Sequence, residues 1–138
     1  MRHFQVSTVL VTLALLISTI PYPFAKNDAF AQSVASAFPG AGRKYAVVFP
    51  KFRAELDFHS ATSLTFTLIQ PDGGRGRTET VNFRAQPIAT NIFLITWQEA
   101  NKTTVVQVED FASGVIFTNI TRADGTFIQD KGTFSEIK

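Results

Sequence analysis

Along most of the chain, apolar and polar residues alternate with a period of two, which is typical of β-strands that bury one face. Eight runs rich in Val, Ile, Thr and Phe follow one another, each bounded by turn residues. They are Lys44–Phe49, Arg53–His59, Ser63–Gln70, Arg77–Ala85, Asn91–Glu99, Thr103–Asp110, Gly114–Arg122 and Thr126–Ser135. No stretch of ten or more residues after residue 31 has a helical period, so only a short helical turn at Gln32–Phe38 is expected.

Short connections join these runs. Pro71-Asp72-Gly73-Gly74 and Asp124-Gly125 are hairpin sequences, because glycine adopts a positive φ without a steric penalty. Strands joined by hairpins form an antiparallel meander, and closing the meander removes its exposed edges. We therefore predict an all-β, eight-stranded antiparallel up-and-down barrel, with a two-sheet sandwich as the alternative.

The fifth run differs from the others because it is apolar on both faces. Ile92 and Leu94 oppose Phe93, Ile95 and Trp97, so both faces of this strand are expected to be buried. The interior of an eight-stranded barrel holds packed side chains or one small ligand. This strand is the natural wall for such an interior.

The first 31 residues have the pattern of a secretory signal peptide. A basic start at residues 2 and 3 is followed by Val6–Ile20, an uncharged run shorter than the roughly 20 residues of a membrane span. Prolines end this run, and Ala29-Phe30-Ala31 places small residues where signal peptidase reads them. An uncleaved N-terminal anchor helix is the alternative.

We expect cleavage between Ala31 and Gln32, with cuts after Ala25 or Ala37 as alternatives. The chain then divides into a signal peptide, residues 1–31, and a barrel domain, residues 32–138. This division predicts an exported protein, periplasmic or secreted, with no stable membrane span after cleavage.

Composition narrows the chemistry. The formal net charge of +2 does not favour nucleic acid as a partner. The sequence has no cysteine, and His59 is the one histidine outside the signal peptide, so no metal site and no cofactor are expected. Phenylalanine is abundant, with 14 residues against a single Trp. That abundance favours a small apolar or aromatic molecule as the partner.

A set of short motifs spans nearly all of residues 32–138. They are Phe38-Pro39-Gly40, Arg43-Lys44-Tyr45, Glu55-Leu56-Asp57-Phe58-His59, Leu64-Thr65-Phe66, Phe93-Leu94-Ile95-Thr96-Trp97-Gln98-Glu99, residues 104–111 (TVVQVEDF), Thr118-Asn119-Ile120, Gly125-Thr126-Phe127 and Gly132-Thr133-Phe134-Ser135. In these motifs the chain resembles the MoaF-like family, named for molybdenum cofactor biosynthesis protein F. The resemblance implies a small calycin-type barrel similar to lipocalins. It does not bring a set of catalytic residues, and the cytoplasmic molybdenum cofactor pathway does not suit an exported chain.

Two candidate site residues lie two apart on the fifth run. Trp97 could stack on a planar ligand, and Glu99, among Phe93 and Ile95, could act as an acid or base with a raised pKa. Alternatively, Trp97 is ordinary core and Glu99 reaches solvent beside the following turn.

Two further candidates lie at strand ends. His59 could shuttle protons at the barrel mouth, or be a rim side chain paired with Asp57. Tyr45 could bond a ligand carbonyl, or cover the end of the barrel. Asp110 is expected to cap the turn that follows the sixth run.

Three functions remain open at this point. The first is a barrel that binds a small apolar or aromatic ligand through Trp97, Phe93, Tyr45 and Glu99. The second is a small enzyme of the isomerase, cyclase or decarboxylase type, with Glu99, His59 and Tyr45 as candidate catalytic residues. The third is a structural or interaction barrel whose core is filled. Interior volume separates the third from the first two.

Overall fold

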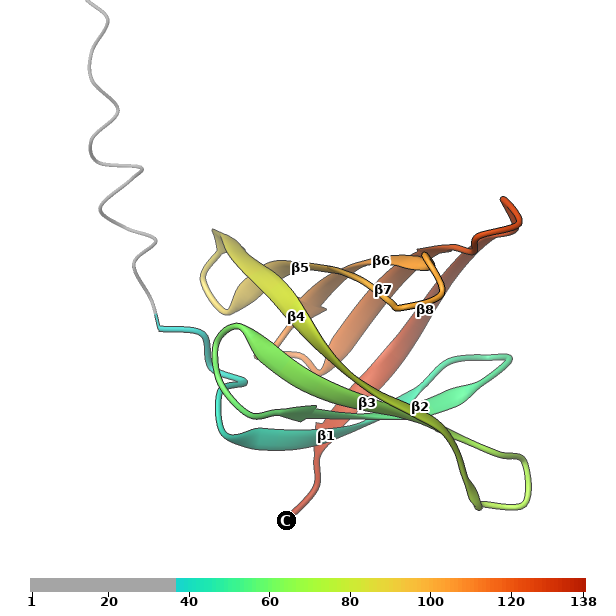
Figure 1. The fold of residues 1–138 in the computed structure, drawn as a ribbon. Coiled ribbons are helices and arrows are strands. Elements are labelled where there is room, and N and C mark those ends of the chain that lie inside the picture. Colours follow the sequence, from blue (N-terminus) through green and yellow to red (C-terminus); the bar gives the residue numbers. More distant parts are fainter. Residues whose placement is uncertain (1–36) are drawn as a thin grey trace, which may run out of the picture.

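The alternating pattern folds as a closed antiparallel barrel in the computed structural model, which describes residues 37–138 (Figure 1). Its strands are β1 (Arg43–Val48), β2 (Arg53–Phe58), β3 (Ser63–Ile69), β4 (Arg75–Ala89), β5 (Ile92–Gln98), β6 (Thr104–Asp110), β7 (Val115–Thr121) and β8 (Phe127–Glu136). Each strand pairs with the next, and β8 pairs with β1. The prediction of an eight-stranded up-and-down barrel is confirmed, and the two-sheet alternative is wrong.

The predicted signal peptide, its cleavage site and most of the predicted Gln32–Phe38 turn lie outside the described residues. Ala37 and Phe38, which belong to that turn, are not helical, and residues 37–138 contain no helix. Within the same residues, no helix is long and apolar enough to cross a membrane.

Strand β4 is longer at both ends than the predicted Arg77–Ala85. Its first half, up to Asn82, pairs with β3, and its second half, from Phe83, pairs with β5. Strands of a closed barrel are tilted and staggered, so one strand serves two neighbours at different heights. The pairing with β5 shifts register beside Pro87, which has no N–H to donate to a ladder.

The seam between β8 and β1 depends on a glycine. A Cβ on Gly132 would collide with the Val48 carbonyl oxygen and would lie 2.7 Å from the Phe49 ring. A bare backbone at this position therefore lets β1 and Phe49 approach β8. At position 132, β8 has no side chain, and this allows the close contact with β1.

Aromatic rings fill one end of the barrel. Phe38, just before β1, lies 5.1 Å from Phe58 and 5.4 Å from Phe93 and Phe111 between ring centroids. Tyr45 lies 5.7 Å from Phe111 in an edge-on arrangement. Such edge-to-face contacts add to the free energy of burying the rings. This end, which also carries the short loop after β6, is closed by side chains.

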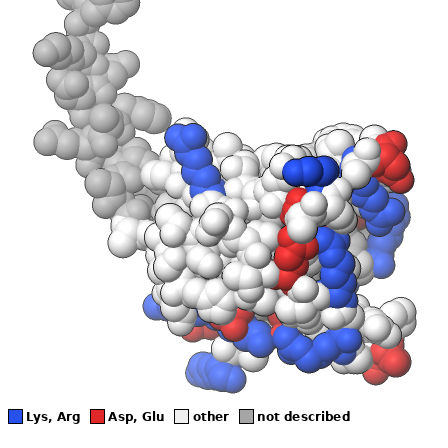
Figure 2. All heavy atoms as spheres, viewed as in Figure 1, with Lys and Arg blue, Asp and Glu red and all other residues white. Residues whose placement is uncertain are grey.

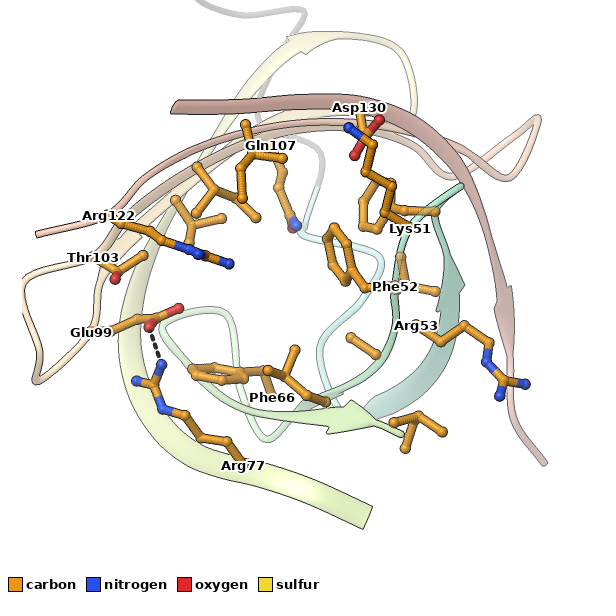
Figure 3. Close-up of a pocket in the computed structure, with 18 of the residues that line it drawn as sticks. Lys51, Phe52, Arg53, Phe66, Arg77, Glu99, Thr103, Gln107, Arg122 and Asp130 are labelled. Atoms are coloured by element: carbon orange, nitrogen blue, oxygen red, sulfur yellow. Dashed lines mark ion pairs between the residues drawn. The ribbon is translucent and has the colours of Figure 1, made fainter. Parts of the chain in front are cut away.

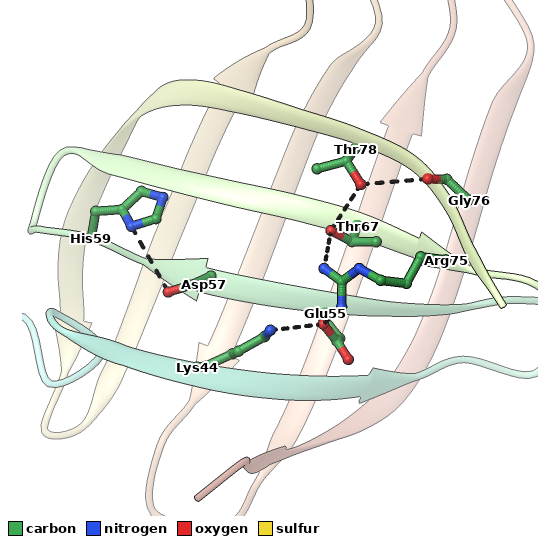
Figure 4. A network of polar contacts seen from close by, with 8 residues as sticks. All are labelled: Lys44, Glu55, Asp57, His59, Thr67, Arg75, Gly76 and Thr78. Carbon is green, nitrogen blue, oxygen red and sulfur yellow. Dashed lines mark hydrogen bonds and ion pairs between the residues drawn. The ribbon is translucent and has the colours of Figure 1, made fainter. Parts of the chain in front are cut away.

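The outer surface is polar in patches. On β2, Glu55 lies 2.9 Å from Lys44 and 2.8 Å from Arg75, and Arg75 donates to the Thr67 hydroxyl (Figure 4). Figure 2 shows that charged side chains gather mainly around the end opposite the aromatic rings, while much of the rest of this face is uncharged.

Asp110 accepts backbone N–H bonds from Ala112 and Ser113, which confirms the predicted turn cap.

Candidate functional site

Behind the charged end, the barrel interior is hollow. The cavity has a volume of about 1090 Å³ and opens among the loops after β1, β3, β5 and β7 (Figure 3). Its deeper wall is mainly apolar and includes Val47, Leu56, Phe66, Trp97 and Val105. A cavity of this size exceeds the space that one or two ordered waters occupy.

Trp97 forms one side of the wall. Its indole ring stacks on the Phe66 ring, with centroids 6.4 Å apart. The Arg77 guanidinium lies over the same Phe66 ring, 5.4 Å from its centroid. Trp97 is 7% exposed, and its indole nitrogen has no hydrogen-bond partner among residues 37–138. Burying an indole N–H without a partner costs free energy. This nitrogen is covered by protein, although the Trp97 side chain lines the cavity.

Two carboxylates hold the Arg77 guanidinium at the cavity mouth. One nitrogen pairs with Glu99 at 2.8 Å and the other pairs with Glu79 (Figure 3 shows the Glu99 pair). Burial raises the pKa of Glu99 above its usual range, although Arg77 opposes this effect. The backbone N–H of Ala100 lowers the pKa of Glu79, and Arg77 adds to the lowering. Two carboxyls on one arginine thus have pKa values shifted in opposite directions.

Arg122 lies on the same rim, at the end of β7. Thr103 comes directly before Thr104 of β6, Arg122 comes directly after Thr121 of β7, and these two strand residues pair with each other. The Glu99 N–H donates to the Thr103 carbonyl. Figure 3 shows the Arg122 guanidinium directed into the cavity. No carboxylate of residues 37–138 lies within ion-pair distance of it.

The inner part of the cavity has a second set of polar groups, on β6, β7 and β8. Gln107 faces Thr118 across one ladder, and Thr118 faces Asp130 across the next. The Gln107 amide donates to the Thr118 hydroxyl at 3.4 Å. The Gln107 carbonyl oxygen and one Asp130 carboxylate oxygen have no partner within residues 37–138. Both are acceptors, so this region of the wall accepts hydrogen bonds and lacks a matching donor.

One layer further along β6, Glu109 is fully buried. It pairs across the sheet with Phe93 and Ile116, and neither carboxylate oxygen has a partner among the described residues. Burial raises the pKa of Glu109 to about 8. Glu109 does not line the cavity: along the chain it lies between Gln107, which lines the cavity, and Phe111, which belongs to the aromatic end.

The structure divides the five residues predicted from sequence into three places. Trp97 and Glu99 line the cavity on one face of β5 and its following residue. Phe93 and Tyr45 belong to the aromatic end instead. His59 is exposed on the outside of the barrel, where its ring bonds the Thr65 hydroxyl at 2.7 Å and lies 3.9 Å from Asp57 (Figure 4).

Sequence reasoning missed Arg77, Arg122 and Gln107. The alternation along β6 already places Gln107 and Glu109 on the same inward face as Val105. From sequence alone, polar residues on an apolar face seem to break the pattern, because the sequence does not show that this face lines the inside of a closed barrel. The two arginines lie at strand ends, where a sequence does not show whether a long side chain turns inward. Among residues 37–138, no three His, Cys, Asp or Glu side chains are grouped as metal ligands.

Comparison with known proteins identifies a family. The MoaF-like family model matches residues 41–135, which include all eight strands except the last residue of β8. A crystal structure of a "putative beta-lactamase" from Burkholderia vietnamiensis is similar, with a TM-score of 0.68 and 28% sequence identity. The match covers 74% of this chain and 99% of that one. No curated protein sequence matches this chain.

Proposed function

The chain belongs to the MoaF-like family, and from this membership and its hollow barrel we propose that it binds a small apolar or aromatic molecule inside the barrel. Residues 1–31 act as a cleaved signal peptide in this proposal, so the binding domain works in the periplasm or outside the cell.

The observation that carries the proposal is the cavity itself. Eight-stranded barrels are narrow enough to be filled by their own side chains. Here the aromatic rings fill one end only, and about 1090 Å³ remains at the other. Ligand sites are mostly apolar concavities with a few placed polar groups, and both features are present. The open volume and its apolar wall support a bound molecule over a filled core.

The test uses 1-anilinonaphthalene, a neutral aromatic probe whose emission rises in apolar surroundings. It should bind the residue 32–138 chain saturably with one site per chain, and should change the emission of Trp97, the single tryptophan. Trp97→Phe should weaken binding by roughly 0.5–1.5 kcal/mol, the size of one lost aromatic contact.

The matched control is Phe117→Leu, because Phe117 is an exposed aromatic side chain outside the cavity. This variant should bind the probe as the wild type does. Absence of saturable binding, or equal weakening by both variants, contradicts the proposal. If the probe binds as expected, mass spectrometry of small molecules that co-purify with the exported protein would identify the natural ligand.

A second function, a small enzyme with one acid–base group, is favoured by the opposite pKa shifts of Glu79 and Glu99 on Arg77. Glu99→Gln keeps the side-chain shape and removes the charge. It should leave binding of the neutral probe nearly unchanged in either case, and should abolish turnover in an enzyme.

The name of the Burkholderia protein does not supply the reaction of this chain. A serine β-lactamase acts through a serine nucleophile, and the described residues that line the cavity include no serine. A chromogenic cephalosporin should therefore be hydrolysed no faster by this protein than by the Glu99→Gln variant.

A further inference from the structure

The polar groups of the cavity are arranged by type. Toward the mouth are donors: the Arg122 guanidinium on the rim and the Trp97 N–H one layer inside it. Further in are acceptors: the Gln107 carbonyl oxygen and one Asp130 carboxylate oxygen. None of the three buried atoms has a partner within residues 37–138. These three atoms are covered by protein, so an occupant of the cavity reaches the Arg122 guanidinium rather than these atoms.

Arg122 differs from the other arginines of the cavity. Arg77 is held between two carboxylates and over the Phe66 ring. Arg53 donates to the carbonyl oxygens of Gln70 and Pro71, and Figure 3 shows it pointing away from the cavity. Arg122 is directed inward and has no ion pair among the described residues.

The acidic groups near Arg122 are engaged elsewhere. Glu99 pairs with Arg77 at 2.8 Å. Asp124 accepts the Thr126 N–H at 2.8 Å within the β7–β8 turn. Asp130 lies further in, on β8, and Lys51 adds another cation to the residues that line the cavity. An anion at the mouth would therefore meet an available guanidinium, whereas an anion further in would lie near two acceptors.

We propose that the molecule bound in the cavity is an amphipathic organic anion. Its aromatic or branched apolar body lies against Trp97 and Phe66, and its carboxylate or similar acid group lies at the mouth against Arg122. This inference rests on the proposed binding function, and it adds the charge and the orientation of the ligand.

The experiment compares two probes that differ in one group. 1-Anilinonaphthalene-8-sulfonate has an acid group, and 1-anilinonaphthalene has the same ring system without it. With the residue 32–138 chain, the anion should bind more tightly than the neutral probe, and each should displace the other. Raising the ionic strength should narrow this difference, because salt screens the exposed guanidinium.

Arg122→Gln removes the charge and keeps a polar side chain. It should weaken binding of the anion by about three- to ten-fold, the range expected for a partly exposed charged contact, and leave the neutral probe unchanged. Arg84→Gln is the matched control, since Arg84 is an exposed arginine on β4 that does not line the cavity. It should change neither affinity.

The outcomes separate the two proposals. If neither probe binds, the binding function itself is wrong. If the neutral probe binds at least as tightly as the anion, the binding function stands and the anionic ligand is refuted. If Arg84→Gln weakens binding of the anion as much as Arg122→Gln does, the overall positive field is responsible and the role of Arg122 is refuted.

Discussion

Glu109 provides a sharp test of the interior. Its carboxyl is completely buried between Phe93 and Ile116 and has no partner within residues 37–138. Burial raises its pKa from 4.5 to about 8, so the folded protein keeps this carboxyl protonated at neutral pH. In the unfolded chain the same group ionises near its ordinary pKa.

The direction of the pH effect follows from proton binding. Between pH 4.5 and about 8, the folded state binds a proton at Glu109 that the unfolded state has released. Stability is therefore highest below this interval and falls as pH rises through it. Each pH unit removes about 1.4 kcal/mol, and the whole interval about 5 kcal/mol. That is a large share of the stability of a small domain.

Glu109→Gln replaces the carboxyl with a neutral group of the same shape. At the acidic end of the interval the variant and the wild type should differ by no more than about 1 kcal/mol, because both interiors are neutral. At the alkaline end the variant should be more stable by several kcal/mol. Urea unfolding of the residue 32–138 chain at a series of pH values measures this difference.

Other titrating groups affect both proteins alike, so the difference between the two curves isolates Glu109. Glu136→Gln is the control, since Glu136 is exposed in an ion pair with Arg43. Its difference from the wild type should not grow with pH above neutrality. Parallel stability curves for the wild type and Glu109→Gln would refute the assignment of a buried neutral carboxyl.

Three further outcomes are expected. Phe38→Ala should lower the free energy of unfolding in urea by about 2–4 kcal/mol, because the Phe38 ring contacts several aromatic rings at the closed end. A decrease of less than about 0.5 kcal/mol would show that the ring does not seal that end. Gly132→Ala should lower the free energy of unfolding by about 1–3 kcal/mol or more, because the alanine Cβ would meet the Val48 carbonyl oxygen and the Phe49 ring. An unchanged unfolding midpoint would contradict the tight β1–β8 seam. The exported protein should begin at Gln32 by intact mass, and a mature chain that keeps the first 31 residues would contradict the predicted cleavage.

Alternation along the chain determined the fold almost completely. A period of two and glycine-containing turns act over a few residues, so they can be read locally, and the strands begin and end within two residues of the predicted positions except in β4. The phase of β5 placed Phe93, Ile95 and Trp97 on one face, and that face is buried. The expectation that both faces of this strand are buried is wrong, because Ile92 and Leu94 on the opposite face are only half-buried. Closure was predicted from the need to satisfy strand edges, and the β1–β8 ladder confirms it.

The division of the interior was decided only by the tertiary structure. Phe93 and Trp97 share one face of one strand, yet the first lies in the aromatic end and the second in the cavity wall. Strand phase gives the face of a residue but not its height in the barrel, which depends on register with seven other strands and on the position of Phe38. Phe38, from the segment before β1, adds one ring to those that the strands and the loop after β6 bring to the closed end.

The polar part of the site depends on the same long-range geometry. His59 directly follows β2 and is outside the barrel, whereas Tyr45 is the third residue of β1 and lies at the closed end. Glu99 and Trp97 could be named from sequence because they share a strand with apolar neighbours. Arg77 and Arg122 could not, because they come from β4 and the end of β7. Arg77 pairs with Glu99, and Arg122 joins the same cavity rim, only when the strands assemble. Local sequence sets which face a side chain occupies, and the closed sheet sets which distant side chains it meets there.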